Sequence, residues 1–344
     1  MNKNIIGGKF FYDRNFSKRK NKINGSFFYN GRSAFYDLLK KRFKNDKIKT
    51  ILLPAFTCKS LIEVTKKLKL KTNFYSINKN FEPNLSKGKD GLVVLIDYFG
   101  INCLKNHKIS NYLNNNHVII DKSHTFLNDF KHQYNQNIFF SLRKLSFLCG
   151  GFHNEFSKVV EKKGVEKFFN QIIAVQKEKA EYVKNINKNR NISYELSLIK
   201  KFENLEKKLT LNSYNTKGSK TLINLYEKYN WSSIIKKRKN NFKFLAEELK
   251  DKFKIINYNN LKEDKTPIFL VIKLSSSKKR DVIRDKLIKN DIFPPILWPK
   301  IKRFNYQKFK YEEELCSTTL CLPIDQRYDI KHMNFTKEIM KKII

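Results

Sequence analysis

The stretch Leu92-Val93-Val94-Leu95-Ile96-Asp97 places five consecutive apolar residues directly before a carboxylate. A short apolar run of this kind is typical of a strand that is buried on both faces of a sheet. Comparable runs follow at His117–Asp121 and Asn137–Ser141, and precede it at Thr50–Pro54 and Lys71–Ser76. These runs predict the strands of one buried sheet.

Two helices are expected beside the first of these strands, one before Thr50–Pro54 and one after it. Ser33–Phe43 and Ser60–Leu70 carry apolar residues at helical spacing. Strands that alternate with helices predict an α/β fold with a mainly parallel sheet. In such sheets the ligand binds at the carboxyl ends of the strands, where Asp97, Asp121 and Ser141 are expected.

The second half of the chain has a different pattern. It is mainly helical, with one further strand. The pattern predicts helices over Lys158–Leu211, Leu222–Leu249, Lys278–Lys289 and Phe335–Ile343, and a strand over Thr266–Leu274. We therefore expect two domains. A large domain spans residues 1–225, with an N-terminal arm at 1–28, and a smaller α+β domain spans 226–344.

The composition gives a strongly basic chain of 344 residues, with 71 Lys and Arg against 32 Asp and Glu and a net charge of +39. Aromatic residues make up 14%, which excludes a disordered polycation because such chains lack apolar surface to bury. Of the basic residues 60 are Lys and 11 are Arg, spread along the whole chain. Scarce Arg argues against nucleic-acid recognition, although a functional basic face remains an alternative.

The five cysteines show neither a C-x-x-C pair nor the spacing of a zinc site; they are Cys58, Cys103, Cys149, Cys316 and Cys321. This predicts no metal site and a reduced, cytoplasmic setting. The first eight residues contain no apolar region of signal-peptide type, and no stretch approaches the roughly 20 apolar residues of a membrane span.

A first candidate site motif is Asn30-Gly31-Arg32-Ser33-Ala34-Phe35. Glycine followed by small residues at the start of a helix suits a phosphate, since backbone N–H groups, a hydroxyl and an Arg lie together there. The alternative reading is that Ser33 is an ordinary N-cap.

A second motif, Val118-Ile119-Ile120-Asp121-Lys122-Ser123-His124, delivers a carboxylate to a strand end and an imidazole three residues later. A carboxylate in this place can pair with a protonated ring nitrogen of a cofactor, and His124 can pack on that ring or hydrogen-bond to it. The alternative is that Asp121 is a strand-end residue that caps the next helix.

A third motif runs from Phe139 to Gly151, where an apolar strand ends in Ser141, Lys144 follows three residues on, and Gly150-Gly151 comes after. Among 60 lysines, Lys144 stands out by its position after a buried strand. A partly desolvated lysine can form a Schiff base with a carbonyl compound.

Together the three motifs resemble the fold-type I pyridoxal-phosphate enzymes, and specifically the DegT/DnrJ/StrS-type sugar aminotransferase family. The resemblance extends from about Gly7 to the C-terminus, where Leu322–Tyr328 is similar to the family's Leu-Pro segment and residues 222–249 to its connecting helix. It implies a three-layer α/β/α large domain and pyridoxal phosphate as the cofactor.

The resemblance also implies roles for individual residues. The phosphate group falls to Gly31, Arg32, Ser33, Ala34 and Ser141, the pyridine nitrogen to Asp121, and the Schiff base to Lys144. His124 takes the family's Gln/His position, and Cys58 stands where the family places an aromatic residue against the cofactor. Asp121, His124 and Lys144 are the expected catalytic residues. The Ser-Leu-Arg-Lys form at 141–144 indicates a divergent branch of the family.

The implied reaction transfers an amino group from glutamate to a nucleotide-linked keto-sugar in cell-surface polysaccharide biosynthesis. A homodimer with its active site at the interface is expected, with Asn215 or Ser219 reaching the partner's phosphate, and Arg143 and Lys122 supporting a basic cleft. The alternatives are a protein of this fold with another substrate or without catalysis, and a basic protein that binds anions or nucleic acid.

Overall fold

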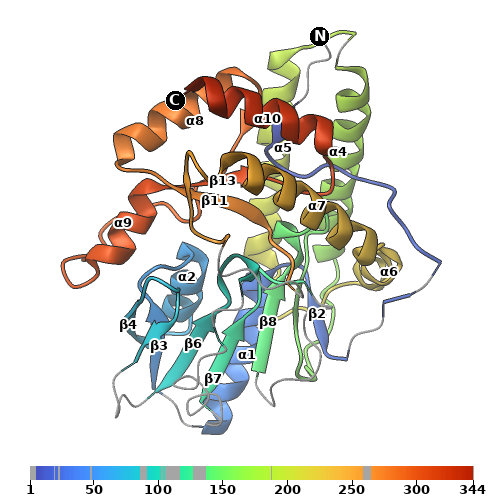
Figure 1. Cartoon of the computed structure of the whole chain (residues 1–344). Helices are drawn as coiled ribbons and strands as arrows, with labels where there is room; N and C mark the ends of the chain where they lie inside the picture. Colours follow the sequence, from blue (N-terminus) through green and yellow to red (C-terminus); the bar gives the residue numbers. More distant parts are fainter. Residues whose placement is uncertain are drawn as a thin grey trace. The chain divides into compact units, whose positions relative to one another are not determined.

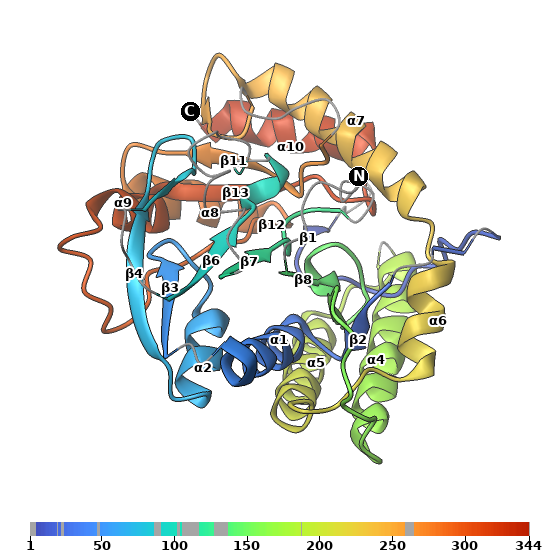
Figure 2. The same cartoon turned by 90° about the horizontal axis from the view of Figure 1, so that it is seen from below.

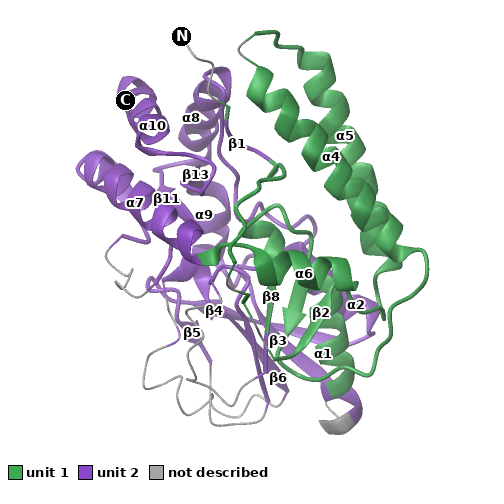
Figure 3. Cartoon of the chain, turned by 90° about the vertical axis from the view of Figure 1, so that its right-hand side faces the viewer, with its two compact units in different colours: residues 1–5, 9–41, 139–231 green, residues 6–8, 42–138, 232–344 purple. Residues whose placement is uncertain are grey.

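The computed structural model describes residues 5–18, 20–21, 24–46, 49–85, 91–101, 104, 117–126, 137–186, 188–258 and 265–343. Two compact units share the chain (Figure 3). Unit 1 comprises residues 1–5, 9–41 and 139–231, and unit 2 comprises residues 6–8, 42–138 and 232–344. The chain passes from unit 1 to unit 2 after Trp231, close to the expected domain boundary near residue 225, which stays a prediction.

Unit 2 contains a mainly parallel sheet, as the sequence predicts (Figure 2). Its strands, in the order in which they pair, are β7 (Val118–Asp121), β6 (Leu92–Ile96), β3 (Thr50–Pro54), β4 (Lys71–Ile77) and β5 (Pro83–Asn84). The pairs β7–β6, β6–β3 and β3–β4 are parallel, and β5 pairs antiparallel to β4. All five residues of β6 are buried, which is why this strand is continuously apolar.

Two short elements follow the carboxyl ends of strands in this sheet. Helix α2 (Lys59–Lys67) comes after β3, and the 3₁₀ turn η1 (Tyr98–Gly100) comes after β6. Ile96 pairs with Asp121 in the register of β6 and β7. The first residues after β6 and the last residue of β7 therefore lie side by side at the carboxyl ends of these two strands.

The C-terminal part of unit 2 contains a second, antiparallel sheet that is packed against helices (Figure 1). An antiparallel sheet is formed by β10 (Lys254–Ile255), β11 (Phe269–Lys273) and β13 (Thr319–Pro323), and β1 (Ile6–Gly7) pairs with β12 (Ile292–Phe293). Helices α7 (Trp231–Leu249), α8 (Ser277–Lys289) and α10 (Ile330–Ile343) share one apolar core with β11 and β13. Helix α9 (Lys310–Thr318) leads directly into β13.

Unit 1 combines three antiparallel strands with helices. Strand β9 (Gly151–His153) pairs with both β2 (Ser26–Phe28) and β8 (Asn137–Ser141). Helix α1 (Gly31–Asp46) follows β2, and the 3₁₀ turn η3 (Leu142–Lys144) follows β8. The helices α4 (Val165–Asn185) and α5 (Ile192–Asn212) pack side by side, and α6 (Lys220–Lys228) follows them (Figure 3).

Two long helical predictions needed correction. The stretch Lys158–Leu211 is two helices, because Asn191 caps α5 by accepting a hydrogen bond from Tyr194 N and so starts a new helix. The stretch Leu222–Leu249 is also divided, since Tyr229 is extended and fully buried, with its hydroxyl bound to Asp13. The packing of one tyrosine breaks a pattern that is helical in sequence.

Candidate functional site

Asp121 ends β7 in unit 2 and its side chain is held by a local turn. The carboxylate accepts a hydrogen bond from Ser123 N at 2.8 Å, and the backbone carbonyl of Asp121 accepts one from Asp97 N at 3.0 Å. Asp121 is 5% exposed. It therefore presents a fixed, nearly buried carboxylate at the strand end, and the element it caps is a turn over residues 122–125 rather than a helix.

Lys122 does not contribute to a basic cleft, in contrast to the expectation from sequence. Its ammonium lies 2.8 Å from the carboxylate of Asp97, with 5% of the lysine side chain and none of the aspartate side chain exposed. Thr125 Oγ1 donates to the same oxygen of Asp97 at 3.1 Å. A buried cation needs a partner of this kind, and the end of β6 supplies it.

His124 follows Asp121 by three residues, in the turn after β7, and is 1% exposed. Its Nδ1 atom accepts a hydrogen bond from Phe99 N at 3.2 Å. The rings of Trp298 and Phe99 stack on the imidazole, with centroids 5.0 and 5.4 Å away and interplanar angles of 17° and 23°. The protein's own aromatic rings therefore provide stacking partners for His124.

Trp298 and Phe99 are site neighbours that sequence reasoning missed. Phe99 follows the strand-end residue Asp97 by two positions, a signal that was available. Trp298 gives little signal, since it lies 174 positions after His124 in a segment without clear periodicity. Contacts of this sequence separation come from the tertiary fold.

Cys58 occupies the N-cap position of α2, after β3. Its thiol is partly exposed and accepts a hydrogen bond from Ser60 Oγ at 3.0 Å. The preceding residue, Thr57, is 1% exposed, and its hydroxyl is one of the buried side-chain atoms of the described residues that lack a hydrogen-bond partner. An orphaned hydroxyl at the start of a helix is suited to an anionic ligand.

The start of α1 in unit 1 shows that Asn30, and not Ser33, is the capping residue. Asn30 Oδ1 accepts hydrogen bonds from Ser33 N at 2.9 Å and Ser33 Oγ at 3.1 Å. The Ser33 hydroxyl also lies 2.9 Å from Ser213 Oγ and is fully buried. Ser33 as a phosphate ligand stays a prediction, and its hydroxyl already has two protein partners. Arg32 is half-buried and Ala34 is buried.

Unit 1 brings the first and third motifs together. A β-carbon added to Gly31 would lie 2.8 Å from Ser141 Cβ, and one added to Gly151 would lie 2.3 Å from Asn30 O. Leu142 N donates to Gly150 O at 2.9 Å, which closes the loop after β8. The glycines therefore allow the start of α1, the end of β8 and the start of β9 to meet.

Lys144 is half-buried at the last position of η3. The neighbouring Arg143 is exposed and forms an ion pair with Glu206 of α5. Lys9 lies 3.5 Å from the same glutamate, and burial, followed by the charge of Arg143, lowers the pKa of Lys9. Arg143 is thus engaged with α5, which accounts for its charge without a substrate.

The two residues suggested for a partner's phosphate have local roles as well. Ser219 caps α6 by accepting a hydrogen bond from Leu222 N at 3.3 Å, and Asn215 accepts one from Lys40 at 3.3 Å. Their role toward a partner subunit stays a prediction.

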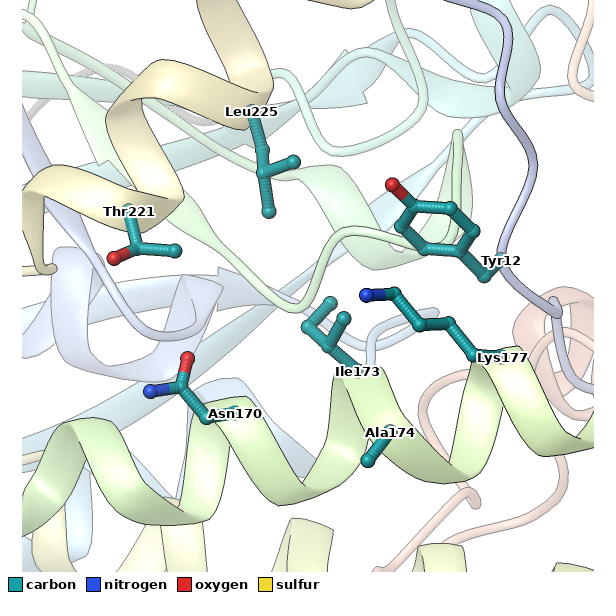
Figure 4. A pocket seen from close by; sticks show the side chains of 7 residues that line it. All are labelled: Tyr12, Asn170, Ile173, Ala174, Lys177, Thr221 and Leu225. Atoms are coloured by element: carbon teal, nitrogen blue, oxygen red, sulfur yellow. The ribbon is translucent and has the colours of Figure 1, made fainter.

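A cavity of about 330 Å³ lies in unit 1, and none of the predicted site residues lines it (Figure 4). It is lined by Tyr12, Asn170, Ile173, Ala174, Lys177, Thr221 and Leu225. Asn170, Ala174, Lys177 and Thr221 are exposed, so the cavity is a surface groove between α4 and α6.

The described part of the chain contains neither a cluster of metal-ligating side chains nor a helix that could span a membrane. No cluster of three or more His, Cys, Asp or Glu is arranged to hold a metal ion there. Within the same residues, no helix combines the length and apolarity needed to cross a membrane. The four cysteines that are described carry free thiols, and Cys103 lies outside the described residues.

Comparison with known proteins finds no matching family model and no matching curated protein. Solved structures do match. The aminotransferase PseC of Helicobacter pylori, involved in pseudoaminic acid biosynthesis, has a TM-score of 0.62 and 13% identity, with 97% of each chain covered. A DegT/DnrJ/EryC1/StrS aminotransferase from Brucella abortus has a TM-score of 0.56 and 14% identity, over 92% of this chain and 85% of that one.

Spr1654 of Streptococcus pneumoniae, in its PLP form, has a TM-score of 0.60 and 10% identity, over 98% of this chain and 94% of that one. Similarity at these identities establishes the fold. The expected fold-type I architecture is therefore confirmed, and it is shared with these aminotransferases over nearly the whole chain.

Proposed function

We propose that this chain is a pyridoxal-phosphate-dependent aminotransferase of the DegT/DnrJ/StrS type that aminates a nucleotide-linked keto-sugar. The observation that carries the proposal is the fold, which matches sugar aminotransferases along almost the full length. Asp121 at the end of β7 and Lys144 in the turn after β8 support it, because a buried carboxylate and a half-buried lysine are the side chains that such a cofactor requires.

The residues present fit the cofactor in three respects. Asp121 offers a carboxylate fixed by Ser123 N, as a protonated ring nitrogen needs. The close approach of Gly31 to Ser141 sets a serine hydroxyl beside the N-terminus of a long helix, which suits a phosphate. The orphaned hydroxyl of Thr57 is a further polar group without a protein partner.

When bound, pyridoxal phosphate supplies an electron sink for the substrate's α-carbon. The chain's own residues then have separate tasks. Asp121 keeps a proton on the ring nitrogen through its negative charge. Lys144 Nζ would hold the cofactor and would move the α-proton of the substrate as general base and acid.

The finer parts of the proposal are the donor, the substrate and the assembly. We propose glutamate as the amino donor, a nucleotide-sugar of cell-surface polysaccharide biosynthesis as the acceptor, and a homodimer as the active form. The net charge of +39 supports an anionic acceptor, since a basic protein concentrates anions near its surface.

The test is a visible absorption spectrum of the purified protein with added pyridoxal phosphate, before and after glutamate. We expect a cofactor band that glutamate removes, and borohydride reduction that fixes the cofactor to the peptide containing Lys144. Lys144→Ala should abolish both, and Lys158→Ala, which removes an exposed lysine of the same unit, should change neither.

Other outcomes select between the alternatives. A band that persists with glutamate but disappears with another amino compound would replace the donor. A protein that binds the cofactor and turns over no donor would be a member of this fold that has lost catalysis. A protein that stays colourless, with salt-sensitive binding to polyanions, would contradict the proposal and favour the basic binding protein.

A further inference from the structure

The loop that carries Asp121 and His124 is fastened to the end of β6 at several points. Asp97 N donates to Asp121 O at 3.0 Å. The Asp97 carboxylate accepts from Lys122 Nζ at 2.8 Å and from Thr125 Oγ1 at 3.1 Å, through the same oxygen. Asp97 therefore holds the loop immediately before and immediately after Ser123 and His124.

The contact with Phe99 fixes the chemical state of His124. A backbone N–H can only donate, so Nδ1 of His124, which receives the Phe99 N–H at 3.2 Å, must be the ring's acceptor atom. A neutral imidazole with an acceptor at Nδ1 carries its hydrogen on Nε2. If Nδ1 carried a proton, its N–H group would face the N–H group of Phe99, and two donors cannot form a hydrogen bond with each other.

The backbone of Phe99 is held in a conformation that a bulky residue rarely adopts. Its φ is 53° and its ψ is 13°, in the left-handed region, where a residue with a side chain is strained. In this conformation the Phe99 N–H reaches His124 and the Phe99 ring stacks on the imidazole. Strain of this kind is retained where the surrounding structure uses it.

The next residue allows the turn to approach the loop closely. Gly100 has a φ of 76°, and a β-carbon there would lie 3.2 Å from His124 O and 2.4 Å from Thr266 O. The turn after β6 therefore contacts both the ring and the backbone of His124. With Trp298 stacked on the same ring, the imidazole has little freedom to rotate.

We propose that Asp97 and Phe99 are positioning residues that hold His124 as the neutral Nε2–H tautomer. His124 then acts as a hydrogen-bond donor through Nε2 and does not accept a proton during the reaction, so proton transfer is left to Lys144. The role of His124 in catalysis rests on the proposed function, whereas its tautomeric state is a property of the protein without cofactor.

The test is nitrogen NMR of protein labelled with ¹⁵N-histidine, without added cofactor, at neutral pH. The His124 signals are assigned by their loss in His124→Gln, among the six histidines of the chain. We expect an unprotonated Nδ1 and a protonated Nε2 in the wild type. A protonated Nδ1, or an average of the two tautomers, would overturn the proposal.

The role of Asp97 is tested in the same spectrum with Asp97→Asn, which weakens the hold on Lys122. We expect a mixture of tautomers and a loss of cofactor affinity of about tenfold, the effect of losing a charged hydrogen bond. An unchanged tautomer and unchanged affinity in a folded Asp97→Asn protein would show that Asp97 does not position His124.

If Asp97→Asn does not fold, a milder pair of variants tests whether Asp97 positions His124. Thr125→Val removes one hydroxyl from Asp97 while keeping the shape of the side chain, and Thr125→Ser keeps the hydroxyl. We expect tautomer mixing in the valine variant and the wild-type spectrum in the serine variant. Thr65→Val, which removes an equally buried hydroxyl from α2, is the control and should leave His124 unchanged.

Addition of pyridoxal phosphate to the same samples separates this inference from the proposed function. A wild-type protein that binds no cofactor but shows the single Nε2–H tautomer, mixed in the variants, would contradict the proposed function and support the positioning by Asp97. A protein that binds the cofactor and shows the opposite tautomer would contradict the positioning alone.

Discussion

Lys122 Nζ lies 2.8 Å from Asp97 Oδ2, and both side chains are almost completely buried. The pair joins the ends of two neighbouring parallel strands, since Asp97 follows β6 and Lys122 follows β7. Removal of one partner of a buried ion pair leaves an uncompensated charge in a medium of low polarity. The pair therefore makes the position of the Asp121 loop sensitive to single substitutions.

We predict that Lys122→Ala destabilises the protein by about 3–5 kcal/mol, because Asp97 would stay buried without its main partner. The measurement is urea unfolding followed by circular dichroism at neutral pH. Lys59→Ala, which breaks an exposed ion pair with Glu63 at 3.4 Å, should change the stability by less than about 1 kcal/mol. If the two substitutions lowered the free energy of unfolding equally, the buried Lys122–Asp97 pair would stabilise the protein no more than an exposed pair does.

Gly31→Ala is expected to disturb the contact between α1 and β8. The added β-carbon would lie 2.8 Å from Ser141 Cβ, closer than side-chain atoms pack. We expect a loss of about 1–3 kcal/mol in stability from overpacking, together with weaker cofactor binding. Urea unfolding and a cofactor titration measure the two effects, and a variant with wild-type values in both would contradict the close approach.

Asp325 is expected to make the stability depend on pH in the acidic range. Burial by itself raises the pKa of Asp325, but the charge and hydrogen bonds of Arg327, with the charge of Arg238, outweigh it and lower the pKa below the ordinary value. A carboxylate with a lowered pKa stabilises the fold above its ordinary pKa, and this contribution is lost as pH falls through the folded-state value.

The measurement is the urea midpoint of the wild type and of Asp325→Asn between neutral pH and pH 3. The variant should be less stable at neutral pH, because Arg327 loses its buried partner. The difference should narrow as the pH falls below about 4, where aspartate begins to protonate in the unfolded chain. A difference that stays constant over this range would contradict the lowered pKa.

Glu312 is expected to change the stability with pH in the direction opposite to Asp325. It is 1% exposed, burial raises its pKa, and its Oε1 accepts a hydrogen bond from Ile77 N at 2.5 Å. A carboxyl with a raised pKa stabilises the fold at low pH, and this contribution is lost as pH rises from the ordinary value through the folded-state value.

We therefore expect Glu312→Gln, which keeps the acceptor and removes the charge, to be more stable than the wild type at pH 8. The two proteins should converge near pH 4, as urea midpoints at both pH values would show. A variant that is less stable than the wild type at pH 8 would indicate that the ionised form is the favoured one.

Much of the fold follows from local sequence. The apolar runs at β3, β6, β7 and β8 are strands because most of their side chains are buried in a sheet, and such burial selects apolar sequence. Helices α1 and α8 begin and end within a few residues of their expected bounds. The parallel arrangement followed from the alternation of strands and helices.

The candidate residues at strand ends were also predictable, since Asp97, Asp121 and Ser141 each follow an apolar run. Their partners were not. The choice of Asn30 over Ser33 as the cap of α1 depends on Ser213, 183 positions from Asn30, which binds both side chains. The break at Tyr229 depends on Asp13 of the N-terminal arm.

The sequence by itself thus determined that the chain is an α/β protein with carboxylates and a lysine placed after buried strands. The tertiary structure decided which charges are engaged: Lys122 is buried against Asp97, Arg143 is paired with Glu206, and His124 is stacked on Trp298. The physical reason is that strand and helix patterns record local burial, whereas the partner of a charge or a ring is set by segments that meet only after folding.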